Sequence, residues 1–281
     1  VARAYVLYRE QRAASRYHTK KLKEQVGVKV SSMMVTKRDG TKEPVSLDKI
    51  TNRVSVLSTG LSIDPIVVAQ KAIPGLYNDI TSTEIDNYLA ETSAALTVEH
   101  PDYSNLAARI KSNALHKLTP GFVIATKNLF EDGLLHESYY NKVIQNAEEI
   151  ESIIDYDRDY SFDYFALTTL IRAYLLKFEN QTIERPQDLW MRVALTVSGK
   201  EFNLSKLKET YDSLSNGLYT HATPTLFNSG LKMQQLSSCF LIGMEDDSIE
   251  GIFNTIKDCA LISKTAGGIG MHAHNIRGSG S

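Results

Sequence analysis

Apolar residues recur every three to four positions through much of this 281-residue chain, which is the period of amphipathic helices. Two stretches break that period. Apolar and polar residues alternate over 33–47 with Asp39–Gly40 at the centre, which predicts a β-hairpin. Near the C-terminus the run QLSSCFLIGM, 235–244, predicts a short buried strand that ends at a turn.

Helix start and stop signals follow the hairpin in close succession. Ser46 is predicted to cap the first helix and Thr81 or Ser82 the third, while Pro74–Gly75 closes the second and Pro101 opens the fourth. We therefore expect residues 33–120 to form a small domain in which a hairpin covers a helical bundle. Residues 121–218 are also predicted to be helical, with the proline of ERPQ in the first turn of one helix.

A further amphipathic helix is predicted between Asp247 and Lys264. Asp247 is expected to cap it, with Glu250 three residues later. One face carries apolar residues at helical spacing, and we expect it to be buried: Ile249, Ile252, Phe253, Ile256 and Ala260. The glycines of TAGGIG are expected to end the helix with positive φ and to let a ligand approach the backbone, although a plain C-cap explains them equally well.

Composition excludes several classes of protein. The formal net charge of −2 gives no electrostatic footprint for nucleic acid. The two cysteines are too few for a disulfide scaffold and fit a reducing cytoplasm. The longest apolar runs are too short to span a bilayer, and the charged start does not read as a signal peptide. The seven histidines show no metal-ligand spacing; His272 and His274 share a strand face without partners.

The residues alone leave the chemistry open. Cys239 follows Ser237 and Ser238, but a lone cysteine in a strand is usually a small buried apolar residue. Lys37 and Arg38 lie in a charged turn, which is ordinarily just solvated. The stretch HATPTLFN, 221–228, is predicted to be a loop that offers hydroxyl and backbone N–H groups.

The ordered motifs ATPTLFN, QLSSCFL, DDSIEGI, SKTAGGIG and IRGSGS resemble the catalytic large subunit of class I ribonucleotide reductase. The resemblance implies that Cys239 is one half of the redox pair that reduces the ribose. It implies that the substrate is held by Thr223, Ser238, Ala266, Gly267 and Gly268. It also implies an effector nucleotide held by Asp247, Ser248, Ile249, Lys264 and Arg277. Helix N-termini and cationic side chains suit such anionic ligands.

The first half of the chain resembles the ATP cone of the same family, on the motifs KRDG, EPVSLDKI and TEID. The resemblance implies that Lys37 and Arg38 contact the phosphates and that Ser82 and Asp86 lie near the base and ribose. Along the nucleotide it places Glu43, Pro44, Val45, Ser46, Leu47, Asp48 and Lys49. Residues 1–32 are read as the last helix of a possible upstream cone, over 1–22, with a linker; the alternative is an amphipathic packing helix with a basic end.

The fold class implied is α/β overall and mostly α-helical in this portion: an ATP cone, a helical domain, and the opening of a ten-stranded α/β barrel over 219–281. The activity implied is reduction of ribonucleoside diphosphates with dithiol oxidation, regulated by Mg²⁺-bound ATP, dATP and other dNTPs. The implied partners are further copies of the chain, in homodimers and higher oligomers, a small subunit with the radical cofactor, and thioredoxin or glutaredoxin. No metal is expected on the chain's own residues.

The family's radical cysteine, second redox cysteine and acid–base residues are expected beyond Ser281, so the chain alone is expected to be inactive. Two alternatives differ in cofactor and in class. An adenosylcobalamin-dependent reductase shares the cone and barrel and needs no small subunit. A non-enzymatic ATP-cone sensor, such as a transcription repressor, carries zinc-ribbon cysteines ahead of the cone; no cysteine precedes it in this sequence, and the barrel motifs would be unexplained.

Overall fold

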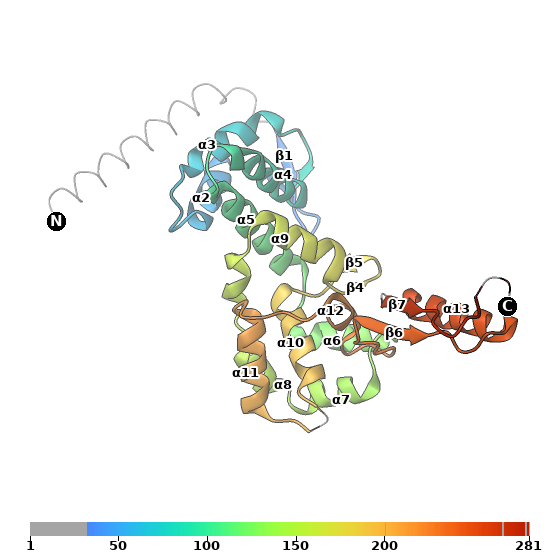
Figure 1. Ribbon diagram of the computed structural model, residues 1–281. Helices are drawn as coiled ribbons and strands as arrows, with labels where there is room; N and C mark the ends of the chain where they lie inside the picture. The colour runs from blue at the N-terminus through green and yellow to red at the C-terminus, as the bar shows by residue number, and fades with distance from the viewer. Residues whose placement is uncertain (1–32, 200, 266, 279, 281) are drawn as a thin grey trace, which may run out of the picture. The chain divides into compact units, whose positions relative to one another are not determined.

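The structure, a computed structural model, describes residues 33–199, 201–265, 267–278 and 280. The chain divides into two compact units. The first contains residues up to Leu118 together with Asp159–Leu170, and the second contains Thr119–Arg158 and the residues from Ile171 onward. Figure 1 shows the elements of each unit along the chain. The helix and linker predicted for 1–32 lie outside the described residues, as does Ala266.

The first unit begins with the predicted hairpin, which is confirmed. Strands β1, Met34–Thr36, and β2, Lys42–Pro44, pair antiparallel. Gly40 takes a φ of 82° at the turn, where a side chain would be strained. A third strand, β3, Ile80–Thr81, pairs parallel to β1 and was not predicted. Two residues are too few for an alternating pattern, so tertiary pairing alone defines this strand.

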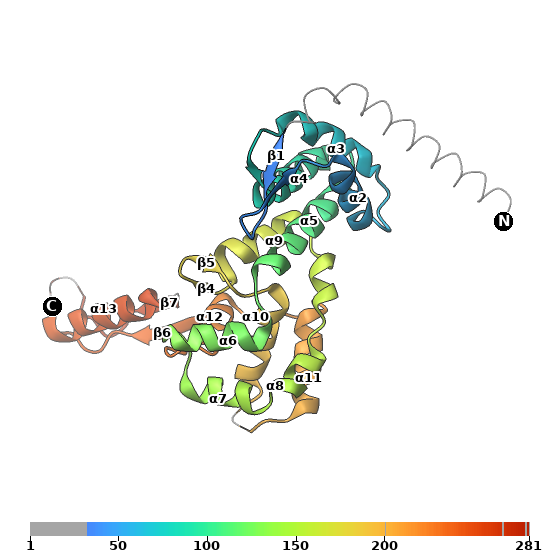
Figure 2. The same cartoon turned by 180° about the vertical axis from the view of Figure 1, so that it is seen from behind.

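The described helices of this unit are α2, Leu47–Leu57, α3, Pro65–Ala72, α4, Ser82–Ala95, α5, Asp102–Leu118, and α9, Tyr164–Thr169. The predicted caps are confirmed. The Ser46 hydroxyl accepts from the Lys49 N–H, and Thr81 forms a full capping box with Glu84. Figures 1 and 2 both show α4 beside α5 and α9 against α5. Fully buried Val54, Leu106 and Ile110 contribute to the core between the helices.

The second unit contains α6, Phe122–Glu131, α7, Glu137–Gln145, α8, Ala147–Ile153, α10, Pro186–Val197, α11, Leu204–Ser215, and α12, Thr223–Asn228. A π-helix, Leu170–Tyr174, precedes a two-stranded hairpin of β4, Lys177–Phe178, and β5, Gln181–Thr182. Helix α10 starts at Pro186 as predicted and is buried from that residue to Leu195. The loop predicted over 221–228 is wrong for residues 223–228, which form the short helix α12 with Pro224 in its first turn.

The last elements are β6, Cys239–Gly243, α13, Ile249–Lys264, and β7, Gly268–His272. The strands pair parallel, and α13 connects them and packs on both. The burial predicted for QLSSCFLIGM and for the apolar helix face is wrong: Leu241 is 92% exposed and Ile249 80% exposed. The reason is that this sheet has two strands among the described residues, so apolar side chains on its outer side have nothing to pack against.

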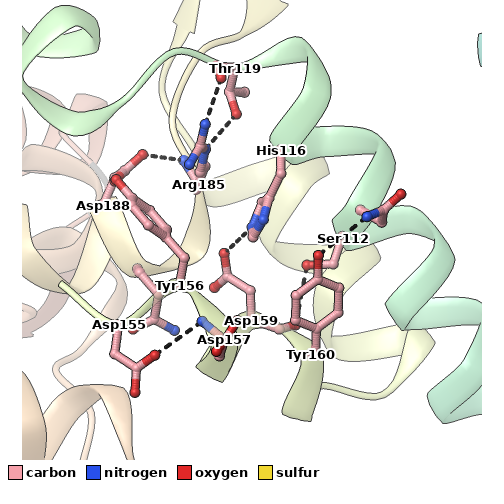
Figure 3. A network of polar contacts seen from close by, with 12 residues as sticks. Ser112, His116, Thr119, Asp155, Tyr156, Asp157, Asp159, Tyr160, Arg185 and Asp188 are labelled. Atoms are coloured by element: carbon pink, nitrogen blue, oxygen red, sulfur yellow. Dashed lines mark hydrogen bonds and ion pairs between the residues drawn. The ribbon is translucent and has the colours of Figure 1, made fainter. Parts of the chain in front are cut away.

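Several buried polar groups are paired within their own unit. In the second unit, Arg185 donates from Nε to the Thr119 hydroxyl at 2.8 Å, and its guanidinium stacks on Tyr156 at 4.6 Å (Figure 3). The Tyr156 hydroxyl donates to Asp188 at 2.7 Å. In the first unit, His116 Nε2 lies 2.7 Å from Oδ2 of the fully buried Asp159 (Figure 3).

Candidate functional site

A cavity of about 470 Å³ opens between the hairpin, α2 and α4 of the first unit. Its apolar part is lined by Val35, Val45, Ile50, Ile85 and Leu89. Its charged part carries five cationic side chains, Lys37, Arg38, Lys49, Arg53 and Lys117, against three acidic ones, Asp39, Glu43 and Asp86. An apolar slot beside an excess of positive charge suits a ligand with a flat apolar ring at one end and an anionic group at the other.

Asp86 organises the charges of this cavity. Its carboxylate is 1% exposed and pairs with both Arg38 and Arg53. Arg53 also donates to the Asn113 side chain at 2.9 Å, yet its Nε is buried without a hydrogen-bond partner. A buried unpaired N–H is costly, so this atom marks a place where a ligand acceptor would be stabilised.

The acid–base properties of the lining report the same excess of positive charge. Burial, together with the nearby charges of Arg53 and Arg38, lowers the pKa of Lys117 to about 8. Burial, then the charge of Arg38, lowers the pKa of Arg53 to about 10. At the exposed rim, hydrogen bonds from Lys37 and Lys49 hold the pKa of Glu43 below its usual value. An anion in the cavity would therefore raise the pKa of the buried cations.

Most of the residues expected to hold a nucleotide on the cone come together in this cavity. Eight of them line it: Lys37, Arg38, Glu43, Val45, Ser46, Lys49, Ser82 and Asp86. Pro44, Leu47 and Asp48 belong to the same stretch but are not among its lining residues.

Sequence reasoning missed two of the cationic residues in the cavity. Arg53 lies one turn after Lys49 on α2, so helical spacing from Lys49 gave a signal that could have identified it. Lys117 lies near the end of α5, about eighty residues from the hairpin. No local pattern links Lys117 to the hairpin, and only the packing of α5 brings it to the cavity.

A second candidate site surrounds Cys239. This residue starts β6, lies opposite Gly268 of β7, and has an exposed free thiol. The Gly268 N–H donates to the Ser238 carbonyl at 2.7 Å, which fixes the strand start. Exposure contradicts the ordinary expectation of a buried structural cysteine and meets one requirement of a reactive thiol. Cys259, by contrast, is half-buried on α13.

The glycines of TAGGIG allow close packing within the chain. A Cβ at Gly267 would lie 2.6 Å from the Ile262 side chain, and one at Gly268 would lie 3.5 Å from the Cys239 sulfur. Neither residue adopts the positive φ that was predicted, and Gly268 and Gly270 belong to β7. The missing side chain of Gly267 therefore makes room for Ile262 of α13, while Gly268 adjoins the thiol. Ala266, also expected in this site, lies outside the described residues.

The start of α13 forms a third cluster. The predicted cap at Asp247 is wrong: Ser248 is the N-cap, and its hydroxyl accepts from the Gly251 N–H at 3.0 Å. Asp247 instead pairs with Arg277, at 3.1 Å between Oδ2 and Nε. Ser248 has the extended backbone of an N-cap, which lets its side chain reach the third residue of the helix. Ile249 follows as the first helical residue, and Lys264 lies at the far end of α13.

The remaining expected residue, Thr223, opens α12. Its hydroxyl oxygen lies 3.3 Å from the Tyr174 hydroxyl, and Tyr174 was not singled out from the sequence. His272 and His274 lie with their Nδ1 atoms 2.6 Å apart. Within the described residues, His, Cys, Asp and Glu nowhere gather in a group of three or more suited to a metal. Nor is any helix of the described ranges apolar and long enough to cross a membrane.

Three known domain families match this chain in order. Residues 33–118 match the ATP cone domain. Residues 160–234 match the all-alpha domain of ribonucleotide reductase, and residues 237–281 match its barrel domain. The cavity lies within the first match, and Cys239 and α13 lie within the third.

Curated relatives are similar over most of this chain. It is 47% identical over 262 residues to the ribonucleoside-diphosphate reductase large chain 2 of Saccharomyces cerevisiae, covering 89% of this chain and 30% of the relative. It is 47% identical to the large subunit of Arabidopsis thaliana, covering 89% and 32%. The large subunit of Caenorhabditis elegans is also 47% identical, covering 89% and 33%. The chain thus spans about a third of the length of these relatives.

Proposed function

Because this chain belongs to the ribonucleotide reductase large-subunit family, we propose that it forms the regulatory and first catalytic part of a subunit that reduces ribonucleoside diphosphates. The observation that carries the catalytic part is the exposed Cys239 thiol at the start of β6, beside the side-chain-free Gly268. The proposal places the protein in the cytoplasm, where thiols are kept reduced.

The reaction removes the 2′-hydroxyl of the ribose. Two thiols supply two electrons and two protons, so the hydroxyl leaves as water, hydrogen replaces it on the carbon, and the thiols become a disulfide. Cys239 is the first thiol. The second must come within about 7 Å between Cα atoms, and we assign it to the part of the subunit beyond Ser281. An external dithiol, thioredoxin or glutaredoxin, then regenerates both thiols by exchange.

The substrate site in this proposal is built from groups around the thiol. Thr223 and Ser238 offer hydroxyls, and Gly267 and Gly268 offer a stretch of backbone without side chains in the way. A hydroxyl is a donor that a diphosphate accepts from. A separate small subunit would hold the radical cofactor, and the chemistry it would supply is one-electron oxidation of the radical cysteine expected beyond Ser281.

Regulation is assigned to two sites. An ATP cone indicates control by a bound nucleotide, and we assign ATP and dATP, each with Mg²⁺, to the cationic cavity. The purine lies against its apolar lining, and the phosphates meet Lys37, Arg38 and the unpaired Nε of Arg53.

The second site is at the start of α13. There Asp247, Ser248 and Ile249, with Lys264 and Arg277, hold a deoxynucleoside triphosphate that selects the substrate, next to a homodimer contact made by α13. Larger oligomers form when dATP fills the cone.

The relatives are named as large chains and large subunits, which favours a reductase with a separate small subunit over an adenosylcobalamin-dependent one. A non-enzymatic nucleotide sensor is not favoured, because it would leave the all-alpha and barrel matches without a role.

The test is Cys239→Ser in the full-length subunit, assayed for deoxynucleotide with its small subunit and with dithiothreitol or thioredoxin as reductant. We expect no repeated turnover, while nucleotide binding at both effector sites is unchanged. Cys259→Ser is the matched control, and it is expected to keep near wild-type turnover because its thiol lies on α13. Near wild-type turnover of the Cys239 variant would show that Cys239 is only a packing residue.

A further inference from the structure

We propose that Tyr174 is a positioning residue, which orients the Thr223 hydroxyl toward the diphosphate of the substrate. This inference rests on the proposed function, in which Thr223 contacts the substrate. Tyr174 itself is assigned no contact with substrate and no part in the chemistry.

One side chain contacts α12 at two points. The Tyr174 hydroxyl lies 3.3 Å from Thr223 Oγ1, and its ring lies 4.8 Å from the Phe227 ring, tilted by 30°. Thr223 and Phe227 are one helical turn apart, so they face the same side of α12. The contact with the Phe227 ring holds the phenol in place, which fixes the direction from which its hydroxyl meets Thr223.

Tyr174 takes this position from an unusual backbone. It is the last residue of the π-helix Leu170–Tyr174 that follows α9. A π-helical turn inserts an extra residue and rotates the side chains that follow it, and such turns are frequent at functional sites. Regular α-helix over the same residues would send the Tyr174 ring in another direction.

The other end of α12 is held as firmly. The buried Arg192 donates to the carbonyls of Leu226, at 3.2 Å, and Ser229, at 2.8 Å. Arg192 is itself paired with Glu184, which also accepts from the Leu176 N–H two residues after Tyr174. Side-chain contacts therefore hold α12 at both ends. Of these contacts, the one from the Tyr174 hydroxyl meets Thr223, the residue proposed to bind the substrate.

The direction of the hydrogen bond between Tyr174 and Thr223 decides whether Thr223 can donate to the substrate. A threonine hydroxyl has one hydrogen to donate, and either oxygen of this pair can be the donor. When the phenol donates to Thr223, the threonine hydrogen is free for a phosphate oxygen, and that bond is charge-assisted. An anionic substrate therefore selects the arrangement in which Tyr174 donates and Thr223 passes its own hydrogen onward.

The experiment is a double-mutant cycle in the full-length subunit with its small subunit, measuring kcat and the KM for the ribonucleoside diphosphate. Tyr174→Phe keeps the ring on Phe227 and removes the hydroxyl. We expect its KM to rise about 2- to 12-fold, the range of one net hydrogen bond, with kcat nearly unchanged. In the Thr223→Val background the same change is expected to leave KM where Thr223→Val alone puts it.

Tyr140→Phe is the matched control, because Tyr140 is also stacked on a phenylalanine, Phe130, at 3.9 Å. Its KM is expected to stay at the wild-type value. An equal rise for Tyr174→Phe in both backgrounds, or none in either, overturns the positioning role. An unchanged KM in Thr223→Val alone overturns the substrate role of Thr223 in the proposed function instead, so the two failures are distinguishable.

Discussion

Arg38 donates from Nη2 to Asp86 Oδ2 at 2.6 Å, and the carboxylate that it meets is 1% exposed. The pair joins the hairpin turn to α4 in the lining of the cationic cavity. Arg53 pairs with the other carboxylate oxygen. One buried negative charge thus holds two guanidinium groups that would otherwise repel each other.

We predict that Asp86→Ala lowers the free energy of unfolding of the chain by about 3 kcal/mol, since removing one partner leaves buried charge uncompensated. Urea denaturation measures this value. Saturating ATP is expected to restore more stability to the variant than to the wild type, because its phosphates replace the lost carboxylate as partner of the two arginines.

The control for this prediction is Asp39→Ala. Asp39 lines the same cavity but accepts from Thr41 and is exposed. The Asp39→Ala variant is expected to keep a free energy of unfolding, and a stabilisation by ATP, close to those of the wild type. Equal stabilisation of wild type and Asp86→Ala by ATP would place the phosphates away from the two arginines.

A second prediction concerns Asp247→Ala in the full-length enzyme. The variant is expected to lose the effect of dTTP on substrate preference, a coupling of about 1–3 kcal/mol, while ATP still acts through the cone. Stability should change by less than about 1 kcal/mol, because the pair with Arg277 is solvent-accessible. Product ratios with mixed substrates measure the coupling.

Asp258→Ala, an exposed change on the same helix, is the control for Asp247→Ala and is expected to keep the dTTP effect. Loss of the responses to both dTTP and ATP in the Asp247 variant would argue for one shared effector site instead of two.

A third prediction compares two ion pairs of the second unit. Glu184 and Arg192 are 3% and 2% exposed. Because Glu184→Ala leaves the buried Arg192 guanidinium without its carboxylate, we expect the free energy of unfolding to fall by about 3–5 kcal/mol. Lys208 and Asp212 form an exposed i, i+4 pair, so Lys208→Ala should cost about 0.5 kcal/mol or less. Thermal or urea unfolding of both variants tests the difference. Similar losses for the two variants would mean that water reaches Arg192.

A fourth prediction is a pH dependence set by Asp188. Burial raises the pKa of Asp188 to about 7, above its unfolded value. The raised value stabilises the folded chain at low pH, and that contribution is lost as pH rises from about 4 to about 7, by at most about 1.4 kcal/mol per pH unit. Wild type should therefore lose stability relative to Asp188→Asn over that window. A difference between the two proteins that stays constant with pH would show that Asp188 is ionised throughout.

Local signals predicted the parts of this fold that short stretches determine. Asp39–Gly40 sets the hairpin, Ser46 and Thr81 set helix starts, and Pro186 sets another, because turn and cap geometry involve only neighbouring residues. At α13 the predicted cap was one residue too early. Asp247 and Ser248 are both suitable N-cap residues, and Ser248 is the one whose side chain caps the helix.

What the sequence could not predict depends on contacts between distant residues. Lys117 reaches the cavity only through the packing of α5. Tyr174 meets Thr223 only because a π-helix redirects it, and residue periodicity carries no sign of that turn. The apolar face of α13 was correctly identified as apolar, but its exposure depends on which elements lie opposite, which periodicity does not encode.

The parallel pairing of β1 with β3 makes nucleotide affinity a measure of complete folding. The hairpin is local and can form early, whereas β3 must return to it after two helices have been ordered, a slow, high-contact-order step. A peptide containing KRDG alone would carry the cationic turn without the α4 carboxylate or the apolar slot. In the proposed function, the cone would therefore bind nucleotide only after β3 has paired with β1, and an incompletely folded chain would not bind it.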